Sequence, residues 1–204
     1  MAVSKKGERR RQILESLVSM LEEEPGLRIT TAKLAERVGV SEAALYRHFP
    51  SKTKMFEGLI DFTEETLFSR ASMVLTQETT AQGRCEKLLL LLLTFAEKNP
   101  GICRLLTCDA LVGETEKLRK RIGQLFDRLE TQIKQVLREA EIKEGIRPVL
   151  PVPSAANLLL SSADGKIVQY VRSNFERPPT QCWNEQWNLL MQGFFKKTMS
   201  ANLS

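Results

Sequence analysis

Apolar residues recur at intervals of three and four along most of the chain, which is the spacing of amphipathic helices. No segment shows a sustained alternation of apolar and polar residues, so the sequence predicts no β-sheet. The pattern therefore predicts an all-α fold whose helices meet along their apolar faces.

The first quarter of the chain predicts a compact group of three helices. A first helix over residues 8–24 ends at Pro25-Gly26, and its buried side is formed by Ile13, Leu14, Leu17, Val18, Met20 and Leu21. Two short helices follow, one capped by Thr30 or Thr31 and the other by Ser41, with Gly39 between them. This predicts a small N-terminal domain, residues 1–51.

Residue 52 begins a continuous helix to about residue 73, which is expected to join this small domain to a larger helical domain, residues 52–204. Further helices are predicted over residues 80–98, which contain a leucine block, and over residues 114–139, 154–175 and 182–199. Asn99-Pro100 marks a new helix start, and residues 145–153, with three prolines, predict a loop.

Large side chains share one face of the last predicted helix. Because bulky apolar groups near a chain end need a cover, a second copy of the same helix is one way to bury them, and burial within one chain is the other. The first alternative predicts a homodimer whose contact is made by Trp183, Trp187, Leu190, Met191 and Phe194.

A helix, a four-residue turn and a second helix between Thr31 and Phe49 match the helix-turn-helix motif, whose second helix enters the major groove of double-stranded DNA. With Leu45 and Phe49 facing inward, the helical period turns the candidate groove-facing residues outward: Glu42, Ala43, Tyr46 and Arg47, with His48 at the edge. Arg47, Glu42 and Ala43 suit base edges. Phosphate oxygens suit Thr30, Thr31, Tyr46, His48 and Lys52.

Charge supports an anionic partner at the same end. The chain has 204 residues, of which 42% are apolar and 27% charged, as in a globular protein, and its net charge is +5. Residues 1–54 hold 11 basic and 7 acidic side chains, so most of the excess lies there. Nucleic acid fits this charge, and so does an anionic membrane surface bound through residues 5–11.

Other function classes have little support in the sequence. Four cysteines without CxxC spacing and a single histidine do not suggest a metal site, and no glycine-rich phosphate loop suggests a nucleotide cofactor. We therefore expect no enzyme activity, no cofactor and no metal. Without a predicted membrane span or a signal segment, we expect a cytoplasmic protein.

Two segments closely resemble the DNA-binding signature of TetR-type regulators: RITTAKLA at residues 28–35 and GVSEAALYRHFPSK at residues 39–52. The resemblance implies an all-helical homodimer. Its small N-terminal domain would bind palindromic DNA, and its larger C-terminal domain would dimerise through the last two helices.

A second resemblance, over roughly residues 9–180, is to the SlmA branch, the nucleoid occlusion factors. It is carried by segments such as FAEKNPG at 95–101, QLFDRLE at 124–130 and VRSNF at 171–175. It implies a DNA-bound, nucleoid-associated antagonist of the division protein FtsZ, whose tail would meet Phe62, Arg70, Leu91, Lys98 and Asn99. Thr94 and Lys98 stand where this branch usually has glycine and arginine.

The runner-up function is a ligand-controlled transcriptional repressor of the same fold. Such a protein would need an enclosed cavity of several hundred cubic ångströms in its C-terminal domain. The bulky leucines of the block favour a filled interior instead.

Overall fold

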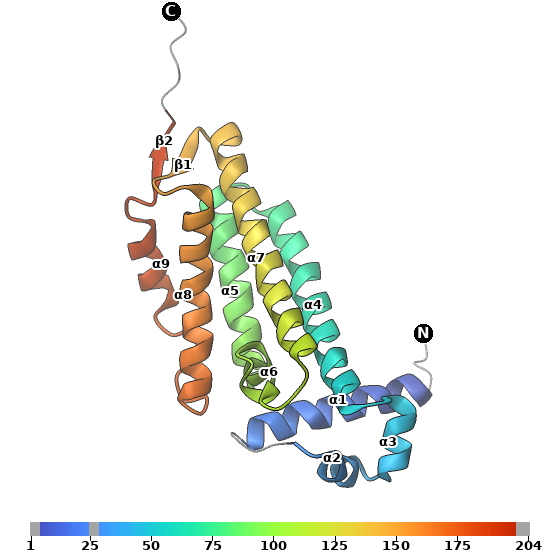
Figure 1. The fold of residues 1–204 in the computed structure, drawn as a ribbon. Helices are drawn as coiled ribbons and strands as arrows, with labels where there is room; N and C mark the ends of the chain where they lie inside the picture. Colours follow the sequence, from blue (N-terminus) through green and yellow to red (C-terminus); the bar gives the residue numbers. More distant parts are fainter. Residues whose placement is uncertain (1–4, 25–28, 199–204) are drawn as a thin grey trace, which may run out of the picture.

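The computed structural model describes residues 5–24 and 29–198, which fold mainly into helices (Figure 1). The all-α prediction is confirmed apart from one small sheet. In chain order the elements are α1 Lys5–Glu23, α2 Thr31–Val38, α3 Glu42–His48, α4 Lys52–Gln77, α5 Ala81–Lys98, α6 Pro100–Leu106, the 3-10 turn η1 Asp109–Leu111, α7 Glu116–Lys143, β1 Ile146–Pro148, α8 Val152–Arg172, α9 Trp183–Met191 and β2 Phe195–Lys197.

The helices α1 to α3 form one compact unit at the lower end of the molecule in Figure 1. Leu34 of α2 and Leu45 of α3 are buried together with Phe49, against the apolar face of α1. As predicted, Leu45 and Phe49 face inward. The proposed stop of α1 at Pro25-Gly26 lies outside the described residues.

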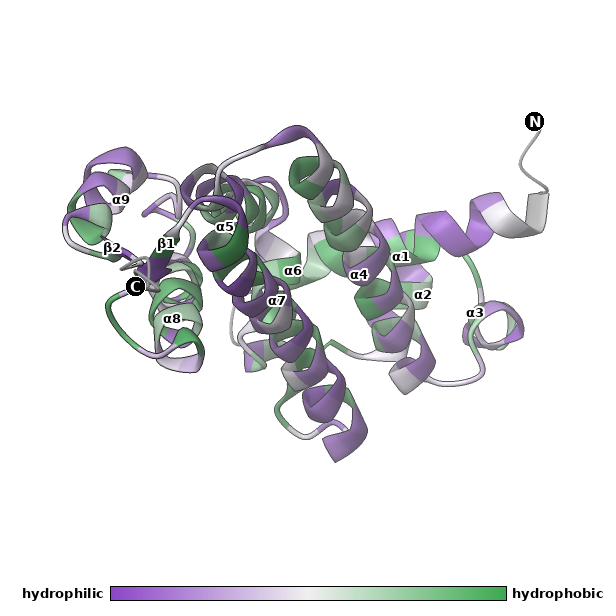
Figure 2. Cartoon of the chain, turned by 90° about the horizontal axis from the view of Figure 1, so that it is seen from above, coloured by the Kyte–Doolittle hydropathy of each residue, from purple (hydrophilic) through white to green (hydrophobic). Residues whose placement is uncertain are grey.

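Upright helices α4, α5, α7 and α8 make up the larger part of the molecule. Seen from above, α5 lies between α4, α7 and α8, and the hydrophilic side of α7 faces outward (Figure 2). Leu88, Leu89, Leu92 and Leu93 of the leucine block are buried at this centre, in agreement with the sequence. In the described part of the chain, no helix combines the length and apolar character needed to cross a membrane.

The structure contains an antiparallel pair of strands that the sequence pattern did not predict, at the end of the molecule opposite α1 (Figure 1). Ile146 pairs with Lys197 and Pro148 with Phe195, so the predicted loop 145–153 contains β1. The last helix was predicted to reach residue 199 but ends at Met191, before Gly193 with φ 74° and then β2. Strands of three residues are too short to show alternation, which is why the pattern missed them.

Three of the five residues expected at a dimer contact are already covered within the chain itself. Trp183 and Trp187 are 2% and 1% exposed, and Phe194 is also buried, all within one chain. The two indole rings lie 5.9 Å apart, and α9 packs against the leucine-rich α5. Because the chain itself covers these rings, the aromatic stripe gives no reason to expect a second copy at that face.

Candidate nucleic-acid interface and partner groove

Both short helices of the N-terminal unit have caps at their ends. Thr30 accepts a hydrogen bond from the Lys33 amide and Ser41 accepts one from the Ala44 amide, which satisfies donors at the two helix starts. Gly39 ends α2 with φ 73°, a left-handed conformation that favours glycine. Residues 39–41 therefore form a short turn that holds α2 and α3 at a fixed angle.

The outer face of α3 carries the residues expected to meet DNA. Glu42, Ala43, Tyr46 and Arg47 are exposed and His48 is half-buried, as the helical period predicts. An exposed face that carries a guanidinium, a carboxylate and a phenol on the second helix of the motif suits contacts in the major groove. The exposure is observed, whereas the role of each side chain on DNA remains a prediction.

A hydrogen-bonded chain that the sequence did not reveal connects α2 to α3. The Thr31 hydroxyl donates to the Glu42 carboxylate at 2.7 Å, and the Tyr46 hydroxyl donates to Thr31 at 3.3 Å. All three residues were expected to meet DNA. To contact a base or a phosphate with these groups, the protein must share or exchange the internal hydrogen bonds.

An ion pair attaches α2 to the end of α1. The Arg37 guanidinium donates to both oxygens of Glu23, at 2.7 and 2.6 Å, and also to the Ser19 hydroxyl. The hydrogen bonds from Arg37, followed by that from Ser19, lower the pKa of Glu23 to about 2. Lys33 of α2 also pairs with Glu24 at 3.3 Å. Two cations of the helix-turn-helix unit are thus used to hold it together.

Lys52 was expected to bind a phosphate, and the structure gives its ammonium group another partner. Its Nζ lies 2.6 Å from a carboxylate oxygen of Glu114, with both side chains largely buried. The two residues are 62 positions apart in sequence, so no local pattern signals the pair. A phosphate contact by Lys52 would therefore share the three ammonium donors with Glu114 or replace this ion pair.

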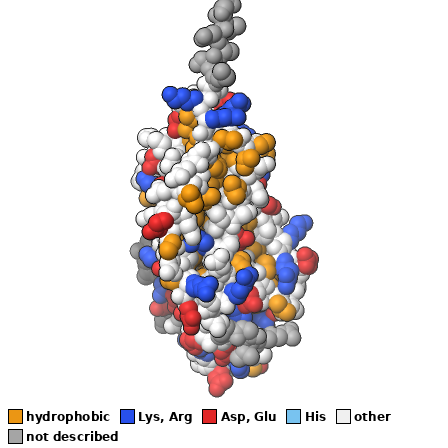
Figure 3. Space-filling view, turned by 90° about the vertical axis from the view of Figure 1, so that its left-hand side faces the viewer, with side chains coloured by type: hydrophobic (Ala, Val, Ile, Leu, Met, Phe, Trp, Pro, Cys, Tyr) orange, Lys and Arg blue, Asp and Glu red, His pale blue; other side chains and the backbone are white. Residues whose placement is uncertain are grey.

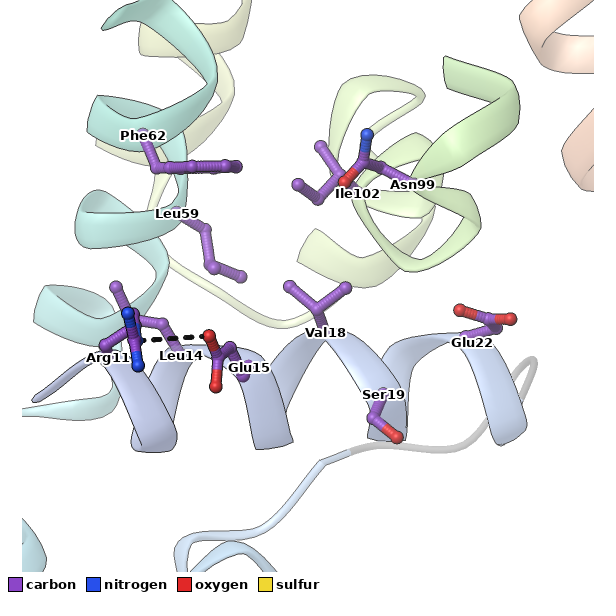
Figure 4. A pocket seen from close by; sticks show the side chains of 10 residues that line it. All are labelled: Arg11, Leu14, Glu15, Val18, Ser19, Glu22, Leu59, Phe62, Asn99 and Ile102. Carbon is purple, nitrogen blue, oxygen red and sulfur yellow. Dashed lines mark ion pairs between the residues drawn. The ribbon is translucent and has the colours of Figure 1, made fainter. Parts of the chain in front are cut away.

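A half-open apolar pocket of about 380 Å³ lies between the N-terminal unit and the larger domain (Figure 4). Leu59 and Phe62 of α4 form one wall, Asn99 and Ile102 at the start of α6 form another, and α1 forms the base. Phe62 is 48% exposed, so it is a surface side chain rather than part of the core. The α1 residues of the pocket are Arg11, Leu14, Glu15, Val18, Ser19 and Glu22.

No residue of α1 was expected to belong to the partner site that includes Phe62 and Asn99. Leu14 and Val18 were predicted to be buried, but both are half-buried and line the pocket. The sequence did contain one indication that α1 faces a second surface. Its apolar stripe is wider than the helices α2 and α3 alone can cover.

Five residues were expected to form a partner site, and the structure brings two of them, Phe62 and Asn99, to this pocket. The Asn99 side chain donates to the Phe95 carbonyl at 2.7 Å, which fixes its position. Lys98 and Arg70 are exposed and Leu91 is half-buried on the neighbouring stretches of α5 and α4. These three do not line the pocket, although they lie on the two helices that lead to it.

Apolar side chains gather on the face formed by α8 and α9 (Figure 3). The exposed large apolar residues of these elements are Leu158 and Leu189, and Val149 and Leu150 directly precede α8. Leu150 and Leu158 also line a shallow hollow with Pro153 and Ser161. Unlike the tryptophans of α9, these side chains are left uncovered by the chain.

Family models match both parts of the chain. Residues 13–59 match the bacterial regulatory proteins of the tetR family, and residues 79–194 match a tetracyclin repressor-like C-terminal domain of the SlmA-like type. The chain is thus a member of the TetR family, with its helix-turn-helix unit and helical C-terminal domain.

Within that family, relatives that match nearly the whole chain share one name. The chain is 59% identical over 189 residues to a protein of Marinomonas named nucleoid occlusion factor SlmA, which covers 93% of this chain and 96% of the relative. A Shewanella pealeana protein with the same name is 57% identical over 192 residues, covering 94% and 98%. The chain belongs to the SlmA family of nucleoid occlusion factors.

Solved structures agree with the fold. The fatty acid degradation regulator FadR of Bacillus halodurans superimposes with a TM-score of 0.79, at 17% identity and covering 93% of this chain and 98% of that one. The ketosteroid regulator of Mycobacterium tuberculosis gives a TM-score of 0.73 at 22% identity, covering 96% and 98%. At such identities the comparison establishes the two-domain helical architecture only.

Proposed function

We propose that this protein is a DNA-bound nucleoid occlusion factor that binds FtsZ and disrupts its polymers, so that no septum assembles over the chromosome. The observation that carries the proposal is the identity of 55–59% to proteins named SlmA over nearly the whole chain, C-terminal domain included. The pocket between the two domains supports the proposal, because it offers an apolar surface that a bound partner segment would bury.

The DNA part of the proposal rests on α3. Its exposed residues would read a palindromic site, with Arg47 donating to guanine, Glu42 accepting from cytosine and Ala43 touching a thymine methyl. Thr30, Thr31, Tyr46, His48 and Lys52 would hold phosphates, together with the exposed arginines 9–11 of α1.

The FtsZ part rests on the pocket and on the surface beside it. An extended peptide with apolar anchors would bury them against Phe62, Leu59 and Val18, where the lining is mainly apolar. The exposed cations Arg70 and Lys98 would favour an acidic or carboxylate-ended segment. Leu91 and Asn99 complete the proposed contact.

Two copies are needed to place two recognition helices on a palindrome. Since Trp183, Trp187 and Phe194 are already covered within the chain, we propose that the dimer forms through the exposed face of α8 and α9, around Leu158. Leu190 and Met191, which the sequence also predicted at the dimer contact, are half-buried and would add apolar contact area to this interface.

The test measures FtsZ polymers by sedimentation, with the protein present and with or without a palindromic duplex. We expect polymer loss to increase when the duplex is added. Phe62→Ala and Arg70→Asp should abolish the effect while DNA affinity stays within about twofold, because both residues are exposed and lie on α4 away from α3.

The matched control is Ile142→Ala, since Ile142 is an apolar side chain that is 86% exposed at the far end of α7. It should retain both activities. If the unmodified protein fails to bind FtsZ even when the palindromic duplex is bound, ligand-controlled transcriptional repression becomes the better-supported function.

A further inference from the structure

The N-terminal unit is joined to the larger domain by more than the continuous α4. Helix α1 packs along α6 more extensively than against any other element. At Gly101 of α6 the two helices are in direct contact, because a Cβ built there would lie 2.2 Å from the Val18 carbonyl oxygen. Any larger residue at this position would push α1 away from α6.

One turn further along α6 lies Arg104, a charged side chain that is only 2% exposed. Its guanidinium donates to the carbonyl of Leu21 at 3.0 Å and to that of Glu24 at 2.9 Å. Both carbonyls lie at the C-terminal end of α1, where a helix leaves acceptors unsatisfied and its dipole favours a cation. Asp109 accepts from Arg104 Nε at 2.5 Å and balances the charge.

The same end of α1 holds the helix-turn-helix motif. Glu23 there binds Arg37 of α2, and Glu24 binds Lys33 of α2. Glu24 therefore accepts from Arg104 through its carbonyl and from Lys33 through its carboxylate. A continuous series of charged contacts leads from the larger domain, through the end of α1, to the helix that packs against α3.

We propose that Arg104 is a positioning residue for DNA recognition, which fixes the angle of the helix-turn-helix unit against the C-terminal domain and thereby the separation of the two recognition helices in the dimer. The inference rests on the DNA-binding part of the proposed function. Arg104 itself is buried and touches no DNA; it acts through α1 and α2.

A fixed separation has a measurable signature. DNA turns once in about ten base pairs, so one base pair inserted between two half-sites rotates one against the other by roughly 35°. A dimer with rigidly placed recognition helices loses affinity for the longer site, whereas a dimer whose units can pivot tolerates it.

The experiment uses a palindromic duplex selected from a random library by the unmodified full-length protein, the same duplex with one base pair inserted at its centre, and a random duplex. Anisotropy titrations should show that insertion costs the unmodified protein at least about tenfold in affinity, or 1.4 kcal/mol. We call this loss of affinity on insertion the insertion penalty. For Arg104→Met we expect weaker binding to the selected duplex and an insertion penalty below about threefold. Its affinity for random DNA should be unchanged.

Arg84→Met is the matched control. Arg84 also donates to a backbone carbonyl, that of Glu78, and to a carboxylate, that of Glu139, but it lies at the start of α5. Its loss should lower stability and leave the insertion penalty intact. Arg104→Lys keeps the cation and should restore part of that penalty.

Two further variants keep the inference testable if Arg104→Met does not fold. Asp109 is 44% exposed, so Asp109→Asn is expected to fold and to reduce the penalty, and Gly101→Ala should do so by displacing α1. The inference would be overturned if a folded, dimeric Arg104→Met protein lost as much affinity on base-pair insertion as the unmodified protein. The same result for both Asp109→Asn and Gly101→Ala would also overturn it. Failure of the unmodified protein to bind the selected palindrome would instead remove the DNA-binding proposal and the inference with it.

Discussion

Arg47 is an exposed cation in the last turn of α3, next to Tyr46 and half-buried His48. A guanidinium forms two parallel hydrogen bonds with guanine, a geometry that other bases do not match. Arg47→Ala should therefore weaken binding to the selected palindrome by about 1–3 kcal/mol per contact and relax its sequence preference. Competition titrations with specific and random duplexes measure this.

Arg119 on α7 is the control for lost positive charge, since it is exposed and lies outside the N-terminal unit. Arg119→Ala should leave the ratio of specific to random affinity unchanged. Equal losses on both duplexes for Arg47→Ala would show that this residue contacts phosphates only.

Glu23 makes the attachment of α2 to α1 dependent on pH. Its folded-state pKa, about 2, lies below the value of about 4.3 for an unperturbed glutamate, so the ionised form is favoured by folding. The resulting stabilisation is present above about pH 4 and is lost as the pH falls toward 2. Glu23→Gln should lower the urea midpoint at pH 7, and the difference from the unmodified protein should shrink to a small remainder over this window.

Glu36→Gln serves as the control, because it removes an exposed carboxylate from α2 without touching the Arg37 contact. A difference between Glu23→Gln and the unmodified protein that is as large at pH 2 as at pH 7 would contradict the assigned ion pair.

At the scale of elements, α3 depends strongly on its cap. It has only seven residues, and Ser41 is its N-cap, with Oγ 3.2 Å from the Ala44 amide. Ser41→Ala should cost about 1 kcal/mol of unfolding free energy, and Ser41→Asn, which keeps a capping oxygen, should cost less. Urea denaturation of both variants checks this, and equal losses would show that the cap contributes nothing.

The sequence predicted the local features of these elements well. The caps, the break at Gly39 and the inward direction of Leu45 and Phe49 depend on near neighbours and on the helical period, which are visible in the chain. The strands β1 and β2 and the pair between Lys52 and Glu114 depend on residues about fifty or more positions apart. Such contacts are decided by tertiary packing and leave no local pattern.

At the candidate sites, too, the features set by the helical period were predicted, whereas the contacts between separate helices were not. Exposure of Glu42, Ala43, Tyr46 and Arg47 followed from periodicity, but the bond between Thr31 and Glu42 did not. The contribution of α1 to the pocket was missed because a wide apolar stripe predicts burial without naming what covers it.

At the scale of the whole molecule, the exposed apolar face of α8 gives a test of the dimer. Leu158 is 42% exposed on α8, and an aspartate there would have to be desolvated if this face is the dimer contact. Leu158→Asp should give a monomeric mass by light scattering at micromolar concentration and should lose palindrome binding. Helical content should remain, because Leu158 lies at the surface.

Ile142→Asp introduces the same charge at a more exposed apolar position, at the end of α7. It should stay dimeric. A dimeric mass for Leu158→Asp would move the interface to another surface.

The length of α4 has a mechanical consequence. Its 26 residues span about 39 Å, and it runs without a break from the helix-turn-helix unit into the larger domain (Figure 1). A lever of this length converts a tilt of about 5° into a displacement of roughly 3 Å at its tip, which is close to the rise of one base pair, about 3.4 Å. In the proposed complex with DNA, the spacing of the two recognition helices would therefore depend on the stiffness of the body as well as on the side chains proposed to contact bases.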